Sequence, residues 1–301
     1  MKRAAIAAAV MVLAIAGVEI AARITRASHN RSVRNLGDKL HVTAFGSGDP
    51  ILFLHGFRGS GRYWEPHLWA LARDHQIIIV DLLGFGRSPW PADARYDVPE
   101  HLGAIHRTVA PIAGGRRMTV VGHSMGAILA AEYARAYSVD VSQVILLNAP
   151  MFRSEEEGQA RIRAMSPMAE MFSVRRIWAR ASCDVVCAFR PLLFRIAPRL
   201  EPGTPPDVAR DGVLHRWESF DRTLRHVVLA SRLEETLRSI APTPIAILHG
   251  TEDWVTDRAR LEEIARETGA TLVVLPGDHN MYLRRPAEVV AAIAEAMTRL
   301  R

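Results

Sequence analysis

Lysine is nearly missing from this chain of 301 residues: Lys2 and Lys39 are the only two among 38 basic residues, and the others are arginines. The formal charge of +6 is spread along the chain, and no run of basic residues is longer than two. Proteins that bind nucleic acid gather their basic residues on one face and carry recognisable motifs, none of which occurs here. The composition therefore predicts no nucleic-acid partner.

Cysteine is equally scarce. Cys183 and Cys187 stand four residues apart in a segment with helical spacing. That spacing puts both thiols on one face of a helix, which favours a pair of reduced structural thiols over a disulfide or a metal site. No cluster of histidines supplies further ligands, so we predict no metal.

Apolar runs are short everywhere except at the N-terminus. A basic start at 2–3 precedes fifteen uncharged residues, 4–18. This layout is typical of a secretory signal or a short membrane anchor. The A-x-A tripeptide at 14–16 favours cleavage, whereas the four arginines at 23–34 favour an anchor. We predict that residues 1–22 are one or the other, which places the protein in the cell envelope, membrane-anchored or exported. An ordinary soluble helix is the third interpretation.

From residue 39 onward, short strand patterns alternate with helical ones. Residues 39–45 alternate in polarity before a turn cluster at 46–50, which predicts an antiparallel edge hairpin. Six mostly β-branched runs are apolar throughout: 51–54, 77–80, 119–121, 144–147, 245–248 and 271–275. Such strands belong to a parallel sheet covered by helices. Helical spacing between them is clear at 64–73, 99–112 and 258–267. The fold class is α/β, a doubly wound, mostly parallel sheet with its ligand site at the carboxyl ends of the strands.

One long interval interrupts this alternation. More than ninety residues without a strand pattern separate the run at 144–147 from the run at 245–248. A structureless loop of that length is out of place in a compact domain. We interpret residues 151–241 as a helical cap inserted over the site, and 23–150 with 242–301 as the core domain. A second independent domain fits less well, because the chain returns to the same sheet.

The pentapeptide at 122–126 has the form G-x-S-x-G and directly follows a strand pattern. A strand that turns abruptly into a helix leaves the middle residue on a strained elbow, where flanking glycines allow close approach. The next eight residues, 127–134, have high helix propensity. Ser124 is therefore the candidate nucleophile.

A serine hydroxyl needs an adjacent imidazole base, itself oriented by a carboxylate. Both groups follow expected strands: Asp253 comes after the run at 245–248, and His279 comes after the run at 271–275. Ser, Asp, His is the chain order expected for such an elbow. Glu252 competes with Asp253 as the acid, and Asn148, which has no charge, is interpreted as structural.

Backbone N–H groups are expected to stabilise a developing oxyanion. Phe57 follows the strand pattern at 51–54, and Met125 follows the nucleophile directly, so we predict that their N–H groups form the oxyanion hole. His55 is interpreted as holding its loop by hydrogen bonding. The segment 81–88 is interpreted as architecture beside the pocket.

These motifs resemble those of the α/β-hydrolase family over residues 39–298. The resemblance rests on 55–57, 81–88, 122–126, 250–253 and 277–279, all in the family's order and separation. It implies a serine-nucleophile, esterase- or lipase-like member with a triad of Ser124, Asp253 and His279, no cofactor, and a cap inserted after the sixth strand. The serine argues against the dehalogenase and epoxide hydrolase branches, which use aspartate.

Asp278, immediately before the expected base, departs from the family's pattern. If its carboxylate faces inward, it raises the pKa of the imidazole next to it.

Ester hydrolysis through an acyl-enzyme is the predicted activity. His279 takes the proton of Ser124 as it attacks an acyl carbonyl, and water then releases the acid. Apolar pieces of the cap, at 165–172 and 191–194, favour a small-molecule or lipid-derived ester with an apolar acyl group. The same triad serves carbon–carbon, thioester and amide hydrolases, and fold analogy does not choose among them.

Two other classes stay open. One is a catalytically idle member that binds a ligand in the capped pocket. The other is a membrane-surface adaptor that works through the N-terminal segment and the basic cap. The sequence assigns no oligomeric state.

Overall fold

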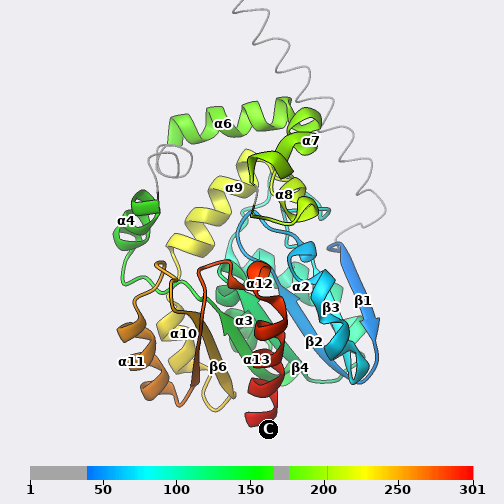
Figure 1. Ribbon diagram of the computed structural model, residues 1–301, viewed down its shortest axis with the longest axis vertical. Helices are drawn as coiled ribbons and strands as arrows, with labels where there is room; N and C mark the ends of the chain where they lie inside the picture. The colour runs from blue at the N-terminus through cyan, green and yellow to red at the C-terminus, as the bar shows by residue number, and fades with distance from the viewer. Residues whose placement is uncertain (1–38, 166–175, 202, 301) are drawn as a thin grey trace, which may run out of the picture.

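A seven-stranded sheet forms the centre of the computed structural model, which describes residues 39–165, 176–201 and 203–300 (Figure 1). The predicted signal or anchor at 1–22 lies outside these described residues. Within them, no helix combines the length and the apolar character needed to cross a membrane.

The strands follow the predicted apolar runs closely. They are β1 (Val42–Gly46), β2 (Asp49–Leu54), β3 (His75–Val80), β4 (Met118–His123), β5 (Val141–Leu147), β6 (Ile245–Gly250) and β7 (Thr271–Leu275). Their order across the sheet is β1-β3-β2-β4-β5-β6-β7. Only the β1–β3 pair is antiparallel within the described sheet. The predicted α/β class, with a mostly parallel sheet, is confirmed.

The predicted edge hairpin was wrong in one respect. β1 is an antiparallel edge strand, but it pairs with β3 and not with its sequence neighbour β2: Val42 lies opposite Val80. The reason is burial, because β2 is apolar on both faces and needs a neighbouring strand on each side, whereas β1 is half-exposed. Gly46 and Gly48, at φ +77° and +107°, carry the chain past the start of β3.

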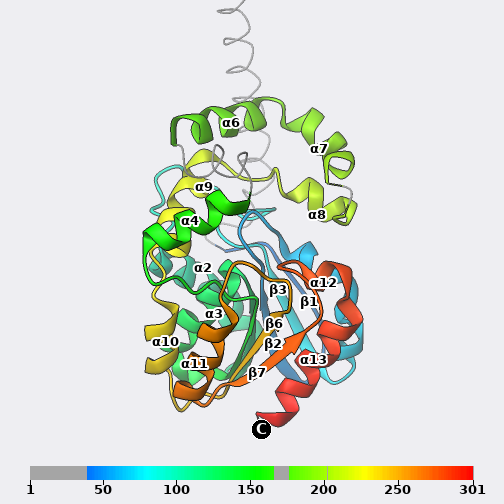
Figure 2. The same cartoon turned by 60° about the vertical axis from the view of Figure 1, so that its left-hand side comes forward.

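Helices cover both faces of the sheet and create two separate cores (Figures 1 and 2). Alternate residues of β2 show the division: Leu52 and Leu54 pack with α2 (Val98–Ala113), α3 (Met125–Ala136) and α11 (Arg258–Thr268). Ile51 and Phe53 pack on the other side with the 3-10 helix η3 (Glu65–Arg73), α12 (Met281–Arg284) and α13 (Pro286–Arg299). The helices expected at 64–73, 99–112 and 258–267 are thus confirmed.

Between β5 and β6 the described chain forms helices. They are α4 (Glu155–Met165), α6 (Arg176–Ala188), α7 (Arg190–Leu200), α8 (Pro206–Asp211), α9 (Trp217–Thr223), the π-helical η6 (Leu224–Leu229) and α10 (Leu233–Ser239). Figures 1 and 2 show α6 and α7 at one end of the molecule, with α13 toward the other. The inserted helical cap is present, but it follows the fifth strand and not the sixth, because five strands of the described sheet precede it. The domain boundaries at 151 and 241 stay a prediction.

Candidate active site

Ser124 sits on a strained turn between β4 and α3. Its φ of 52° and ψ of −119° lie in a region that non-glycine residues rarely occupy. Both flanking glycines are required by space: a Cβ on Gly122 would lie 2.1 Å from the carbonyl oxygen of Gly126, and a Cβ on Gly126 would lie 2.3 Å from that of Leu54. The elbow predicted from G-x-S-x-G therefore exists, and it presents Ser124 at the carboxyl end of the sheet.

The structure brings the three predicted side chains together in one line. The Nε2 atom of His279 lies 2.9 Å from Oγ of Ser124. On the other side of the ring, Nδ1 lies 3.1 Å and 3.2 Å from the two carboxylate oxygens of Asp253. Because the carboxylate accepts from Nδ1–H, Nε2 is left to accept the proton of the serine hydroxyl. Glu252 is exposed, so Asp253 is the acid that contacts His279.

Asp253 is held as a carboxylate. Burial alone would raise its pKa, but the hydrogen bond and charge of His279, together with the N–H of Val255 at 2.9 Å, leave that pKa below its ordinary value. An ionised Asp253 can stabilise the imidazolium that forms when His279 takes a proton.

The two expected oxyanion donors belong to backbone next to the nucleophile. A Cβ on Gly56 would lie 3.3 Å from Cβ of Ser124, so the backbone before Phe57 runs directly beside the serine. Met125 begins α3, where the first N–H groups have no partner inside the helix. Neither the N–H of Phe57 nor that of Met125 donates a hydrogen bond within the described residues. Both donors are available to a bound oxyanion.

His55 and Asp81 hold the loops around these donors, as expected. His55 is fully buried; its Nε2 accepts the N–H of Leu82 at 2.8 Å and its Nδ1 lies 2.8 Å from the carbonyl of Gly56. Asp81 accepts the N–H groups of Gly61 and Arg87 at 2.7 Å and 2.8 Å. Both residues therefore act on the position of the backbone.

Two positioning residues were missed or undervalued in the sequence. Asn148 is fully buried at φ 47°; its Nδ2 donates to the carbonyls of Asp278 and His279 at 3.1 Å and 2.9 Å, and its Oδ1 accepts the N–H of Gly250 at 2.9 Å. His123, inside the pentapeptide, has its Nε2 2.8 Å from the carbonyl of His279. A polar residue at the end of a buried strand was the available signal for Asn148.

Asp278 does not meet the imidazole of His279 directly. Its carboxylate lies 3.1 Å from the guanidinium of Arg284 and accepts the N–H of Asn280 at 3.0 Å. The acid before the base therefore stabilises its own loop.

A cavity of about 580 Å³ adjoins Ser124 and His279. Its lining is largely apolar, from the core side and from the inserted helices: Phe57, Phe152, Ile162, Leu224, Val228, Trp254, Val255 and Leu283. Arg58 and Glu201 are its only lining residues with a permanent charge among the described residues. The Arg58 guanidinium has no ion-pair or hydrogen-bond partner within the described chain, and Arg58 directly follows Phe57, one of the two predicted oxyanion donors.

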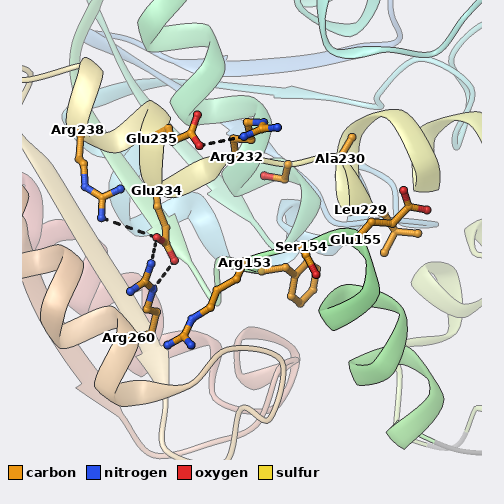
Figure 3. Close-up of a pocket in the computed structure, with 12 residues that line it drawn as sticks. Arg153, Ser154, Glu155, Leu229, Ala230, Arg232, Glu234, Glu235, Arg238 and Arg260 are labelled. Atoms are coloured by element: carbon orange, nitrogen blue, oxygen red, sulfur yellow. Dashed lines mark hydrogen bonds and ion pairs between the residues drawn. The ribbon is translucent and has the colours of Figure 1, made fainter.

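A second cleft, of about 670 Å³, lies at the side of the molecule between the start of α4 and the helices α10 and α11 (Figure 3). Glu234 of α10 lies between the guanidinium groups of Arg260 and Arg238, and Glu235 pairs with Arg232. None of the described lining residues is a histidine. This cleft is an ion-paired junction between helices and lacks the groups of an acyl-transfer site.

Neither cysteine lies in the site. Both are buried thiols of α6 and form no disulfide. In the described part of the chain, no group of three histidine, cysteine or acidic side chains could hold a metal ion.

Three features together are typical of one known family of proteins. They are the turn at Ser124, the hydrogen bonds that join Asp253, His279 and Ser124, and the order of the strands in the sheet. Residues 51–292 match the model of the alpha/beta hydrolase family, which is more than half of the chain. The protein belongs to the α/β-hydrolase family.

Individual relatives point to several hydrolase activities. The chain is 33% identical over 280 residues to the "Probable lysophospholipase BODYGUARD 3" of Arabidopsis thaliana, covering 80% of this chain but 55% of the plant protein. The chain thus spans about half the length of that relative. It is 31% identical over 255 residues to the "Putative carbamate hydrolase RutD" of Escherichia coli, covering 83% of this chain and 91% of that protein.

Among solved structures, the fold is similar to that of E-2-(acetamidomethylene)succinate hydrolase. The TM-score is 0.67 at 23% identity, over 86% of this chain and 95% of the other. At that identity the similarity speaks for the fold alone.

Proposed function

We propose that this protein is a serine hydrolase that cleaves carboxylic esters through an acyl-enzyme intermediate. The observation that carries the proposal is the unbroken line from Asp253 through His279 to Ser124, which ends at an apolar cavity. A nucleophile, a base within hydrogen-bond reach and an orienting acid are the parts that covalent acyl transfer needs.

The first half-reaction forms the acyl-enzyme. His279 removes the proton of Ser124 while Oγ attacks the ester carbonyl, and the N–H groups of Phe57 and Met125 donate to the oxyanion. Collapse of the tetrahedral intermediate breaks the bond to the alcohol, which leaves with the proton from His279. Asp253 balances the imidazolium charge during both proton transfers.

The second half-reaction releases the acid. Water enters in place of the alcohol, gives a proton to His279, and its oxygen attacks the acyl carbonyl. The second tetrahedral intermediate then expels Ser124 Oγ, which recovers its proton from His279. No other group is needed for turnover.

We infer that the substrate combines an apolar acyl chain with an anionic group. The cavity's apolar side chains suit the acyl chain. Arg58 is the cation beside them, and its guanidinium forms no ion pair with an acidic side chain among the described residues. A lysophospholipid, the substrate class to which the name of the plant relative refers, has both features, because it carries one acyl ester and a phosphate.

We also propose that residues 1–22 direct the protein to the cell envelope, either as an anchor that is retained or as an export signal that is removed. Cell fractionation with N-terminal sequencing of the recovered protein separates the two. Recovery of an intact N-terminus in the soluble cytoplasmic fraction would contradict both.

The test of the activity is hydrolysis of p-nitrophenyl esters of increasing acyl length by the full chain, beside Ser124→Ala. We expect turnover that rises with acyl length, and a fall in kcat of about 10⁴-fold or more in the variant, because the nucleophile is lost. Labelling by a fluorophosphonate should disappear with the same substitution.

The outcomes separate the competing functions. Labelling of Ser124 without ester turnover would move the assignment to carbon–carbon, thioester, amide or carbamate bonds, for which the same residues serve. Folded protein without labelling would support the idle, ligand-binding alternative.

A further inference from the structure

Helix α6 is apolar on two faces, and only one of them is covered. Ala179, Cys183 and Cys187 follow each other at spacings of four and are buried toward the rest of the cap. On another face, Trp178 and Val185 are 60% and 49% exposed. A helix of a soluble protein normally has one apolar stripe, directed at the core. The second stripe of α6 is left largely accessible to solvent.

The exposed stripe continues past the end of α6 into α7. Phe189, four residues after Val185, is 46% exposed, and Leu192 is 55% exposed. Arg195 and Arg199 lie three and seven residues after Leu192, on the same face of α7, and both are exposed. Neither arginine forms an ion pair within the described residues. The acidic residue of these two helices, Asp184, already has Arg180 at 3.8 Å.

We call this surface the cap face: Trp178, Val185, Phe189, Leu192, Arg195 and Arg199. Figures 1 and 2 both show α6 and α7 at the outer end of the molecule, away from the sheet. The cap face thus belongs to the helices farthest from the sheet, and it combines large exposed apolar side chains with two exposed arginines that form no ion pair within the described residues. Contiguous apolar surface of this kind marks a site of interaction.

We propose that the cap face docks on the surface of an anionic lipid bilayer. Tryptophan and phenylalanine side chains partition into the boundary between headgroups and acyl chains, and exposed arginines attract anionic headgroups. An exposed helix pair with apolar and basic side chains on one face meets both requirements. A folded protein partner would instead need carboxylates opposite Arg195 and Arg199. The proposal goes beyond the hydrolase activity and does not depend on it.

Brominated lipids test the proposal, because bromine on an acyl chain quenches tryptophan at close range. Full-length protein is mixed with vesicles of phosphatidylcholine and phosphatidylglycerol, brominated or not, and compared with Trp178→Phe. The matched control is Trp69→Phe, since Trp69 is 64% exposed in η3, outside the cap face. Residues 1–38 contain no tryptophan, so membrane binding through that segment does not imitate the signal.

We expect brominated anionic vesicles to quench the wild type and Trp69→Phe to a similar extent, and to quench Trp178→Phe at most half as much. The part of the quenching that depends on Trp178 should be smaller with vesicles of phosphatidylcholine alone or at high salt. In the first case the anionic headgroups that attract Arg195 and Arg199 are missing, and in the second their attraction is screened. Equal quenching of wild type and Trp178→Phe, or no quenching at all, would overturn the proposal.

A second copy of the chain is the competing occupant. Sedimentation velocity without lipid distinguishes the two occupants. If the wild type is a dimer and Phe189→Ser is a monomer, the cap face serves self-association and the bilayer proposal is overturned. A monomer that is quenched on vesicles supports it. Exposed positions tolerate these substitutions, and unchanged thermal unfolding verifies that each variant is folded.

Discussion

Asn148 connects the loop that carries the acid to the loop that carries the base. It bonds the N–H of Gly250, at the end of β6, and the carbonyls of Asp278 and His279, after β7. Its φ of 47° suits asparagine, which tolerates the left-handed region better than most residues. The side chain therefore sets the distance across which His279 reaches Ser124.

Removal of this amide should slow catalysis more than it weakens binding. For Asn148→Gly, which keeps the backbone angle, we expect kcat for an activated ester to fall about 10- to 100-fold with little change in KM, because the base is misplaced. Asn148→Ala adds backbone strain and should unfold at a lower temperature than Asn148→Gly. The rate of fluorophosphonate labelling, measured well below the unfolding temperature, should fall in parallel with kcat. An unchanged labelling rate would contradict a positioning role.

Arg58 should discriminate between substrates by charge. For Arg58→Gln we expect kcat/KM for a lysophosphatidic acid to fall about 5- to 10-fold, the range of one ion pair in a half-open site, and kcat/KM for the matching monoacylglycerol to stay within about twofold. Arg58→Lys should recover part of the difference. Equal losses on both esters would show that Arg58 supports the oxyanion loop and not the anionic group.

At the scale of elements, the close contact of β4, α3 and β2 determines the geometry of the elbow. The start of α3 lies so close to the end of β2 that Gly126 has no room for a side chain, and the obstacle is the backbone of Leu54. Backbone atoms of a central strand cannot move aside as a flexible side chain can.

The substitution Gly126→Ala should therefore unfold the protein or lower its free energy of unfolding by about 3 kcal/mol or more. The matched control is Gly103→Ala in α2, where the added Cβ meets only the end of the Arg107 side chain at 3.1 Å. That change should be neutral or stabilise by about 0.5–1 kcal/mol, because alanine restricts the unfolded chain. Urea denaturation of both variants measures the difference, and similar losses would refute the packing explanation.

Local sequence patterns predicted where the strands, the helices and the candidate catalytic residues lie along the chain. They predicted less well which of these segments are neighbours in space. Ser124, Asp253 and His279 each follow an apolar run in a loop that contains glycine, so the sequence indicated all three. The order of strands was less accessible, because β1 and β2 are adjacent in sequence yet flank β3. The bridging role of Asn148 depends on partners 102 to 131 residues away, which no local pattern contains.

The whole molecule contains several histidines that are buried as neutral rings. Burial lowers the pKa of His101 and of His123 to about 3, and it also lowers the pKa values of His55 and His215. In the unfolded chain these rings titrate near 6.5. Between about pH 6.5 and 3 the unfolded state therefore binds more protons than the folded state.

Stability should accordingly fall as the pH drops below about 6.5. Each neutral histidine contributes up to about 1.4 kcal/mol per pH unit in this window, and the contribution is complete above it. Urea denaturation at pH 7, 6, 5 and 4 gives the slope. His101→Gln should reduce the slope of the free energy of unfolding against pH by up to about 1.4 kcal/mol per pH unit, which is the contribution of one proton. This holds whatever the effect of the substitution on stability at pH 7. A slope that is identical in wild type and variant would contradict the assignment of His101 as a neutral ring.

β5 and β6, between which the inserted helices begin and end, are paired neighbours in the sheet, with Val144 opposite Ile245. Because β5 and β6 are parallel, the insertion leaves at the carboxyl end of β5 and returns at the amino end of β6, at opposite edges of the sheet. Both ends of the insertion are fixed by these paired strands, so the segment between them can be exchanged as a unit between relatives while the register of the sheet is kept. Substrate range and reaction chemistry can then evolve separately, which is one way in which a single scaffold could serve relatives whose names describe such different reactions.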